Sequence, residues 1–137
     1  MRRPLLCLDF EGTLISNGIS QIPRPGLHDF LIEASHLFDL AIYTSVSQRR
    51  ATAIQKLLVS EGAAPAWFAD LDVIRPVGTL KPKSACNRGD AYLLDDQHDV
   101  IAPGENEWWI PIPEFLPPYP EDDRALEETL ARIKELT

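Results

Sequence analysis

Residues 5–14 read Leu5-Leu6-Cys7-Leu8-Asp9-Phe10-Glu11-Gly12-Thr13-Leu14, a short apolar run that delivers two acidic side chains into a Gly-Thr turn. The run is too short for a buried helix and is closed by a glycine, so it predicts a buried β-strand. Because extended backbone repeats every two residues, the side chains of Asp9 and Glu11 are expected to share one side. Two carboxylates at a strand end are costly in a core unless a cation or a reaction uses them. Taken alone, the segment is equally compatible with an acidic turn after an edge strand.

The size and composition of the chain limit the class of protein to which it can belong. Its 137 residues are enough for a sizeable core, and we predict a single domain over residues 1–137. The 45% hydrophobic and 25% charged fractions are typical of a soluble globular protein. A formal net charge of −8 argues against a broad face for nucleic acid or anionic membrane. No apolar run approaches the roughly 20 residues of a membrane span. We therefore expect neither a membrane nor a nucleic-acid partner, and the composition leaves the oligomeric state open.

The cysteines and the N-terminal residues indicate the cellular compartment of the protein. The chain has two cysteines, Cys7 and Cys86, and they lack a metal-ligand spacing. A pair without a disulfide framework predicts a reducing compartment, the cytoplasm. The first apolar stretch meets Asp9 too early for a secretory signal peptide. Cys7 falls within the predicted strand, where we expect a small core residue.

The rest of the chain alternates between strand and helix patterns. Further strands are predicted at residues 38–43, 72–75, 91–94 and 108–112, the last at an edge because it contains a proline. Helices are predicted over residues 25–37, from a cap at Ser45 or Ser47 to Gly62, and from about Glu121 onward. Their inward side chains are predicted from apolar spacing to be Leu27, Phe30, Leu31, Ala34, Leu37, Ala51, Ile54, Leu57, Leu58, Leu126, Leu130, Ile133 and Leu136. This alternation predicts a three-layer α/β/α, Rossmann-like fold around a central parallel sheet, with its site at the carboxyl ends of the strands.

Four polar groups recur at the predicted strand ends. In chain order they are Asp9 with Glu11, Thr44 with Ser45, Lys81 or Lys83, and Asp95 with Asp96. Each group alone has an ordinary explanation as a helix cap, a solvated lysine or an acidic turn. Together they fit phosphoryl transfer through an aspartyl-phosphate. In that reaction one carboxylate attacks phosphorus, and a second acid protonates the leaving oxygen and later deprotonates water. Carboxylate-bound Mg²⁺ would offset the negative charge, and a lysine, a hydroxyl and backbone amides would stabilise the phosphoryl oxygens.

With these motifs the chain resembles the haloacid dehalogenase (HAD) superfamily, in the capless branch related to NLI-interacting-factor and RNA polymerase CTD phosphatases. The opening Asp-x-Asp-x-Thr motif of that family stands here as residues 9–13. The similarity continues through residues 24–31, 42–45, 81–82 and 93–96. The connection between residues 14 and 25 has no room for a cap domain. The resemblance implies a HAD fold and Mg²⁺-dependent hydrolysis of a phosphomonoester carried by a small molecule or a macromolecule.

The resemblance also implies roles for individual residues. Asp9 would be the nucleophile, Glu11 the general acid, and Thr44 together with Ser45 the phosphate ligand. Lys81 would steady the phosphorylated intermediate, with Lys83 as the second candidate. Mg²⁺ would be held by Asp9, Asp95, Asp96 and the backbone carbonyl of Glu11. Arg49, just after the Thr-Ser pair, is a candidate contact for a second anionic group of the substrate, against the plainer interpretation of a solvated helix residue.

Glu11 is the departure from the pattern, since the family carries aspartate at that position. Its extra methylene can displace the acid by more than an ångström, and a misplacement of about 1 Å can cost ~10²-fold in rate. Two hypotheses follow: a phosphatase that uses Glu11, or a catalytically weak module that binds phosphate and metal as a scaffold. A phospho-accepting receiver domain fits less well. In receivers the acidic pair follows the first strand, whereas here the adjacent acids come after the lysine.

Overall fold

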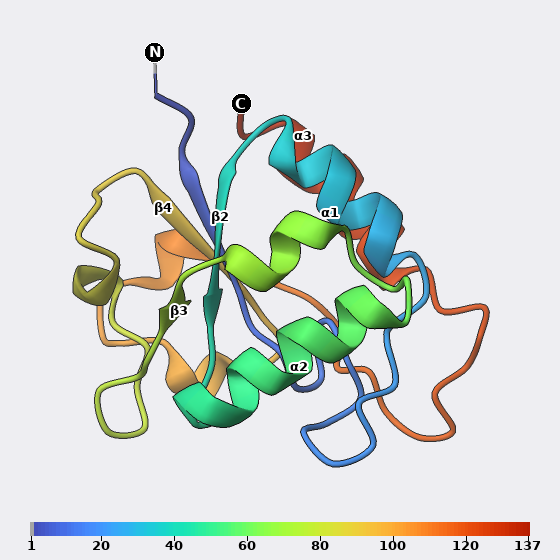
Figure 1. The fold of residues 1–137 in the computed structure, drawn as a ribbon. Coiled ribbons are helices and arrows are strands. Elements are labelled where there is room, and N and C mark those ends of the chain that lie inside the picture. The colour runs from blue at the N-terminus through green and yellow to red at the C-terminus, as the bar shows by residue number, and fades with distance from the viewer. Residues whose placement is uncertain (1) are drawn as a thin grey trace.

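The sheet at the centre of the molecule is parallel and has five strands. The computed structural model describes residues 2–137. The strands are β1 (Leu5–Leu8), β2 (Asp39–Tyr43), β3 (Val73–Ile74), β4 (Ala91–Asp95) and β5 (Trp109–Pro111). Their spatial order is β3-β2-β1-β4-β5, which places β1 in the middle (Figure 1). This sheet confirms the predicted α/β class and the predicted first strand.

The two faces of the sheet are covered differently. Because side chains alternate along β1, Leu6 and Leu8 face one side, and Leu5 and Cys7 face the other. The first side packs against α1 (Leu27–Ser35), α2 (Gln48–Ser60) and α3 (Ala125–Lys134), and α1 and α3 lie side by side (Figure 1). The second side is covered mainly by short 3-10 helices, among them η2 (Lys83–Cys86) and η4 (Asn106–Trp108). The third layer is therefore built from short helical turns.

The buried thiols lie on this second side. Cys7 is fully buried in β1, as predicted for a core residue. Its Sγ lies 3.3 Å from the Sγ of Cys86, which arrives from η2. The contact joins the central strand β1 to η2.

Two predicted helix starts were wrong, and in both cases a local turn explains the shift. The first helix begins at Leu27 because Gly26 adopts a left-handed conformation with φ of 82°. The last helix begins at Ala125 and not near Glu121, because Asp123 accepts a hydrogen bond from the Ala125 amide (3.1 Å) and holds the preceding residues in a turn. Of the two serines proposed as the cap of α2, Ser47 fills that role by accepting from the Arg50 amide.

The predicted inward faces contained two errors. Leu57 is 38% exposed and Leu136 is 41% exposed. On α2 the buried position belongs to Gln55, whose side-chain amide donates to the carbonyls of Phe68 (2.9 Å) and Leu71 (3.1 Å). A buried glutamine satisfied in this way cannot be found from apolar spacing.

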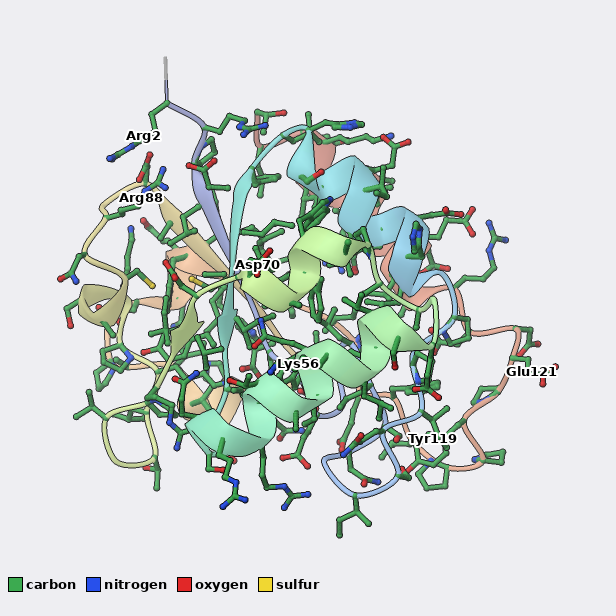
Figure 2. The ribbon with its side chains drawn as sticks, viewed as in Figure 1. Arg2, Lys56, Asp70, Arg88, Tyr119 and Glu121 are labelled. Atoms are coloured by element: carbon green, nitrogen blue, oxygen red, sulfur yellow. The ribbon has the colours of Figure 1, made fainter. Side chains whose placement is uncertain are left out.

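The end of the sheet where β1 begins carries an ionic cluster. Arg88 forms ion pairs with Asp39 (2.9 Å) and Asp90 (3.0 Å), and Arg2 also reaches Asp90 (3.5 Å). Figure 2 shows Arg2 and Arg88 together at this end. The carboxyl ends of the strands lie at the opposite end of the sheet.

Within residues 2–137, no helix has the length and apolar character required to cross a bilayer.

Candidate functional site

Three carboxylates meet at the carboxyl ends of β1 and β4. Asp9 directly follows β1, Asp95 ends β4, and Asp96 follows it. Because Leu8 lies opposite Leu94 in the register of the two strands, the acids that follow emerge side by side. One oxygen from each of the three carboxylates lies within 4.8 Å of the others. They line a cavity of about 360 Å³.

Lys81 is buried among these acids. Its Nζ donates to Asp9 Oδ1 (2.9 Å) and to Asp95 Oδ2 (2.5 Å), and its backbone amide donates to the carbonyl of Val100 (2.7 Å). Lys83 lies two residues further on, in η2, where its backbone amide donates to Glu105 (2.9 Å). Of the two candidate lysines, the structure brings Lys81 to the carboxylates.

Burial dominates the electrostatics of this cluster. It raises the pKa of Asp9 and of Asp95, because an ionised carboxylate loses its water; the Lys81 ammonium opposes both shifts without cancelling them. Burial lowers the pKa of Lys81, but the two carboxylates raise it by more, so the ammonium stays charged. Three carboxylates around one ammonium leave excess negative charge. Because a close set of carboxylate oxygens is the donor set that Mg²⁺ prefers, these residues fit such a cation.

The turn after β1 adds a residue that had no predicted role. Thr13 Oγ1 lies 3.1 Å from Asp9 Oδ2 and 3.0 Å from Asp96 Oδ1, so it joins the acids of β1 and β4. The sequence feature that could have pointed to Thr13 is its place as the last residue of the Asp-x-Asp-x-Thr motif. Glu114 also lines the cavity, because the Phe115 amide donates to the carbonyl of Gly12 (2.8 Å) and folds this segment back. No local pattern in the sequence marks Glu114.

Gly12→Ala is expected to damage the site more than the fold. Gly12 has φ of +76°, and a Cβ there would lie 2.4 Å from Asp96 Oδ2. Since that oxygen ends a movable side chain, Asp96 can turn away and relieve the clash. We expect Mg²⁺ affinity, measured by calorimetry, to fall at least about tenfold.

Gly26→Ala is the matched control for this substitution. Gly26 has φ of +82°, and nothing lies within 4 Å of a Cβ there. Both variants should lose about 1–2 kcal/mol of stability to the left-handed backbone, measured by urea denaturation. Equal Mg²⁺ affinity in the two variants would contradict the assignment of Asp96 as a ligand.

Of the other predicted site residues, Glu11 and Ser45 line the cavity, whereas Thr44 and Arg49 do not. Glu11 is exposed and lines the cavity, and its Oε2 accepts from the Gly18 amide (2.7 Å). Ser45 is also among the lining residues. Thr44 is buried, and its Oγ1 accepts from the Val46 amide (3.1 Å). Arg49 is exposed in the first turn of α2. Among the described residues, neither Thr44 nor Arg49 lines this cavity.

Comparison with protein-family models matches residues 4–137 to the NLI interacting factor-like phosphatases, which confirms the resemblance drawn from the motifs. A search of curated proteins gives no match.

Two solved structures share the fold. One is a variant of the fission yeast RNA polymerase II CTD phosphatase Fcp1 bound to beryllium fluoride, with a TM-score of 0.62. The other is described as Fcp1, an essential RNA polymerase II CTD phosphatase, with a TM-score of 0.64. Each is 20% identical over 98% of this chain, which spans 50% and 49% of their chains, respectively. At that identity the likeness concerns the fold.

Proposed function

The chain belongs to the NLI interacting factor-like phosphatase family, and from that membership we propose that it hydrolyses a phosphomonoester through an aspartyl-phosphate on Asp9. The observation that carries the proposal is the meeting of Asp9, Lys81, Asp95 and Asp96 in one cavity. Each of these groups has a part in phosphoryl transfer that its position allows.

In the first step a carboxylate oxygen of Asp9 attacks phosphorus, and the bond from phosphorus to the ester oxygen breaks. Glu11 donates a proton to that oxygen, which leaves as an alcohol. In the second step Glu11 takes a proton from water as the water oxygen attacks phosphorus. The bond from phosphorus to Asp9 then breaks, which releases inorganic phosphate and restores the carboxylate.

The remaining residues stabilise charge. Lys81 would hold the phosphoryl oxygens and the carboxylate of Asp9, since its Nζ already lies 2.9 Å from Asp9 Oδ1. Ser45, which lines the cavity, and Thr44, the buried residue before it in the chain, would bind the phosphate. Asp9, Asp95, Asp96 and the backbone carbonyl of Glu11 would hold Mg²⁺, which supplies positive charge for the phosphoryl group.

The open site favours a phosphate displayed on a protein. The loop between β1 and α1 holds no inserted domain that could close over the cavity. The two structural relatives are described as phosphatases of a polymerase domain, a macromolecular substrate. We therefore place phosphorylated protein segments ahead of small phosphate esters as substrates.

Phosphate release tests the proposed function. The purified chain is assayed with para-nitrophenyl phosphate, phosphopeptides, nucleotides and sugar phosphates, with Mg²⁺ and then with excess EDTA. We expect turnover that EDTA removes and added Mg²⁺ restores, with the highest kcat/KM on a phosphopeptide. Mg²⁺ binding without turnover on any of these would contradict the proposal and favour the scaffold alternative.

Lys81→Met and Lys83→Met separate the two lysines. Methionine keeps an unbranched side chain as long as the carbon chain of lysine and removes the ammonium. Loss of Lys81 should lower kcat by on the order of 10²-fold, the range observed when one stabilising donor is removed. Loss of Lys83 should change kcat by a few-fold at most, because Lys83 is not among the residues that line the acid cavity. Comparable losses in the two variants would refute the assignment of Lys81.

A further inference from the structure

A chain of two hydrogen bonds connects Glu11 to helix α2. Arg50 Nη2 donates to the carbonyl oxygen of Gly18 (2.6 Å), and the amide of Gly18 donates to Glu11 Oε2 (2.7 Å). We propose that Arg50 is a positioning residue, which fixes the general acid Glu11 through the backbone of Gly18. This inference rests on the proposed function, in which Glu11 carries the proton.

The glycine lies between the two side chains. A Cβ at Gly18 would lie 3.3 Å from Glu11 Oε2 and 3.5 Å from Arg50 Nη2, so the carboxylate and the guanidinium both close onto this one residue. All three residues line a second hollow of about 380 Å³, which shares Glu11 and Ser45 with the acid cavity. Arg50 therefore acts at the margin of the acid cavity.

Besides the Arg50 bond, the loop that carries Gly18 is held by bonds among its own residues and by one bond from Asn17 Nδ2 to the hydroxyl of Tyr119 (3.3 Å). Asn17 Oδ1 accepts from the amides of Ile19 and Ser20 (2.8 Å each), and Gln21 Nε2 donates to the Gly18 carbonyl (2.9 Å). These bonds shape the turn without attaching it to a helix. The Arg50 bond attaches it to α2, a helix of 13 residues packed on the sheet.

Attachment matters because Glu11 is exposed and long. A glutamate has one more rotatable bond than the aspartate usual in the family, so its carboxylate has more positions available to it. The Gly18 amide selects one of them, and Arg50 keeps that amide in place. Because a displacement of about 1 Å at a reacting group costs ~10²-fold, this pair of bonds compensates for the extra methylene of Glu11.

The dependence of rate on leaving group tests the role of Arg50. In Arg50→Ala, kcat/KM for phenyl phosphate should fall by about 10²-fold, because phenolate needs the proton that Glu11 supplies. For dinitrophenyl phosphate it should fall by a few-fold at most, because that leaving group departs without protonation. Equal losses on the two esters would reveal a structural role and overturn the proposal.

Two further variants complete the test. Lys56→Ala, an exposed lysine on the same helix (Figure 2), should leave both rates unchanged. In a Glu11→Gln background, Arg50→Ala should cause no further loss on phenyl phosphate, since a residue that acts only through Glu11 has nothing left to position. A second loss of similar size would overturn the proposal.

Hydrogen exchange of the Gly18 amide, measured by NMR, tests whether Arg50 holds this amide in place and does not require turnover. Arg50→Ala and Glu11→Gln should each speed exchange of this amide by about fivefold or more, and Lys56→Ala should not. If the wild-type chain hydrolysed no ester, the proposed function would fail while the exchange data still tested the link. Unchanged exchange in both variants would refute the link itself.

Discussion

Asp9→Asn is expected to abolish phosphate release, lowering kcat by on the order of 10⁴-fold or more, as loss of a covalent nucleophile does. Asparagine has nearly the same shape, and its oxygen can still accept from Thr13, which lies 3.1 Å from Asp9 Oδ2. Its amide cannot form an acyl phosphate. Phosphate release and mass spectrometry of acid-quenched protein, which detects the aspartyl-phosphate, measure the result.

The same variant should remain folded. Burial raises the pKa of Asp9, so folding favours its protonated form and the ionised carboxylate destabilises the native state at neutral pH. Removing that charge should leave Tm unchanged or raise it. Asp70→Asn, at an exposed aspartate on η1 (Ala66–Asp70, Figure 2), is the control and should keep full activity. Full activity in Asp9→Asn would exclude the proposed mechanism.

Arg24→Met is expected to cost about 3–5 kcal/mol of unfolding free energy, the range observed when one partner of a buried ion pair is removed. Arg24 is 1% exposed, and it donates to both carboxylate oxygens of Asp123 (2.9 and 3.1 Å). Its Nη1 also donates to the carbonyls of Gly12 and Thr13 (3.2 Å each). One guanidinium therefore joins the turn of the opening motif to the segment before α3.

Urea denaturation measures this loss, and Arg124→Met is the matched control. Arg124 pairs with Glu127 (2.8 Å) at an exposed site on the same segment. Exposed ion pairs contribute little, so the control should leave the urea midpoint unchanged. Equal midpoints for Arg24→Met and wild type would show that the buried pair does not hold the segment.

The Arg24 effect should also depend on pH. Burial is the largest single influence and raises the pKa of Asp123, but the Arg24 hydrogen bonds, the Ala125 amide and the charge of Arg24 together lower it by more, so the folded value lies below the ordinary 3.8. A lowered carboxyl pKa contributes stability that is complete above 3.8 and is lost as pH falls through the folded value. The difference between wild type and Arg24→Met should therefore shrink in acid, which urea midpoints on both sides of that pH will show.

The sequence predicted the elements that local patterns encode. The apolar run before Asp9 predicted a strand, and the alternation of strands and helices after it predicted a parallel sheet. Parallel sheets bring their carboxyl ends to one edge, so the meeting of Asp9 with Asp95 and Asp96 could be predicted from topology. These predictions depended on the parallel direction of the strands and not on any loop.

The contacts that depend on the geometry of loops could not be predicted from the sequence. Lys81 and Lys83 are two residues apart in the sequence, which does not show which of them reaches the carboxylates. In the structure, the bond from the Lys81 amide to the carbonyl of Val100 holds the backbone of Lys81 in place. Arg24 carried no assigned role, because its partner Asp123 lies about a hundred residues away and nothing local indicates the pairing. Leu57 was wrongly placed inward because Gln55 fulfils its hydrogen bonds in the interior.

The position of β1 between β2 and β4 has a consequence for biosynthesis. β1 leaves the ribosome before β2 and can pair with it early, but its other neighbour, β4, is made only after residue 90. Until then Asp9 has no opposing acids, and no nascent chain that stops before Asp96 contains the three carboxylates. Cation uptake by this group would therefore wait for a long-range contact that can form only once β4 has been made.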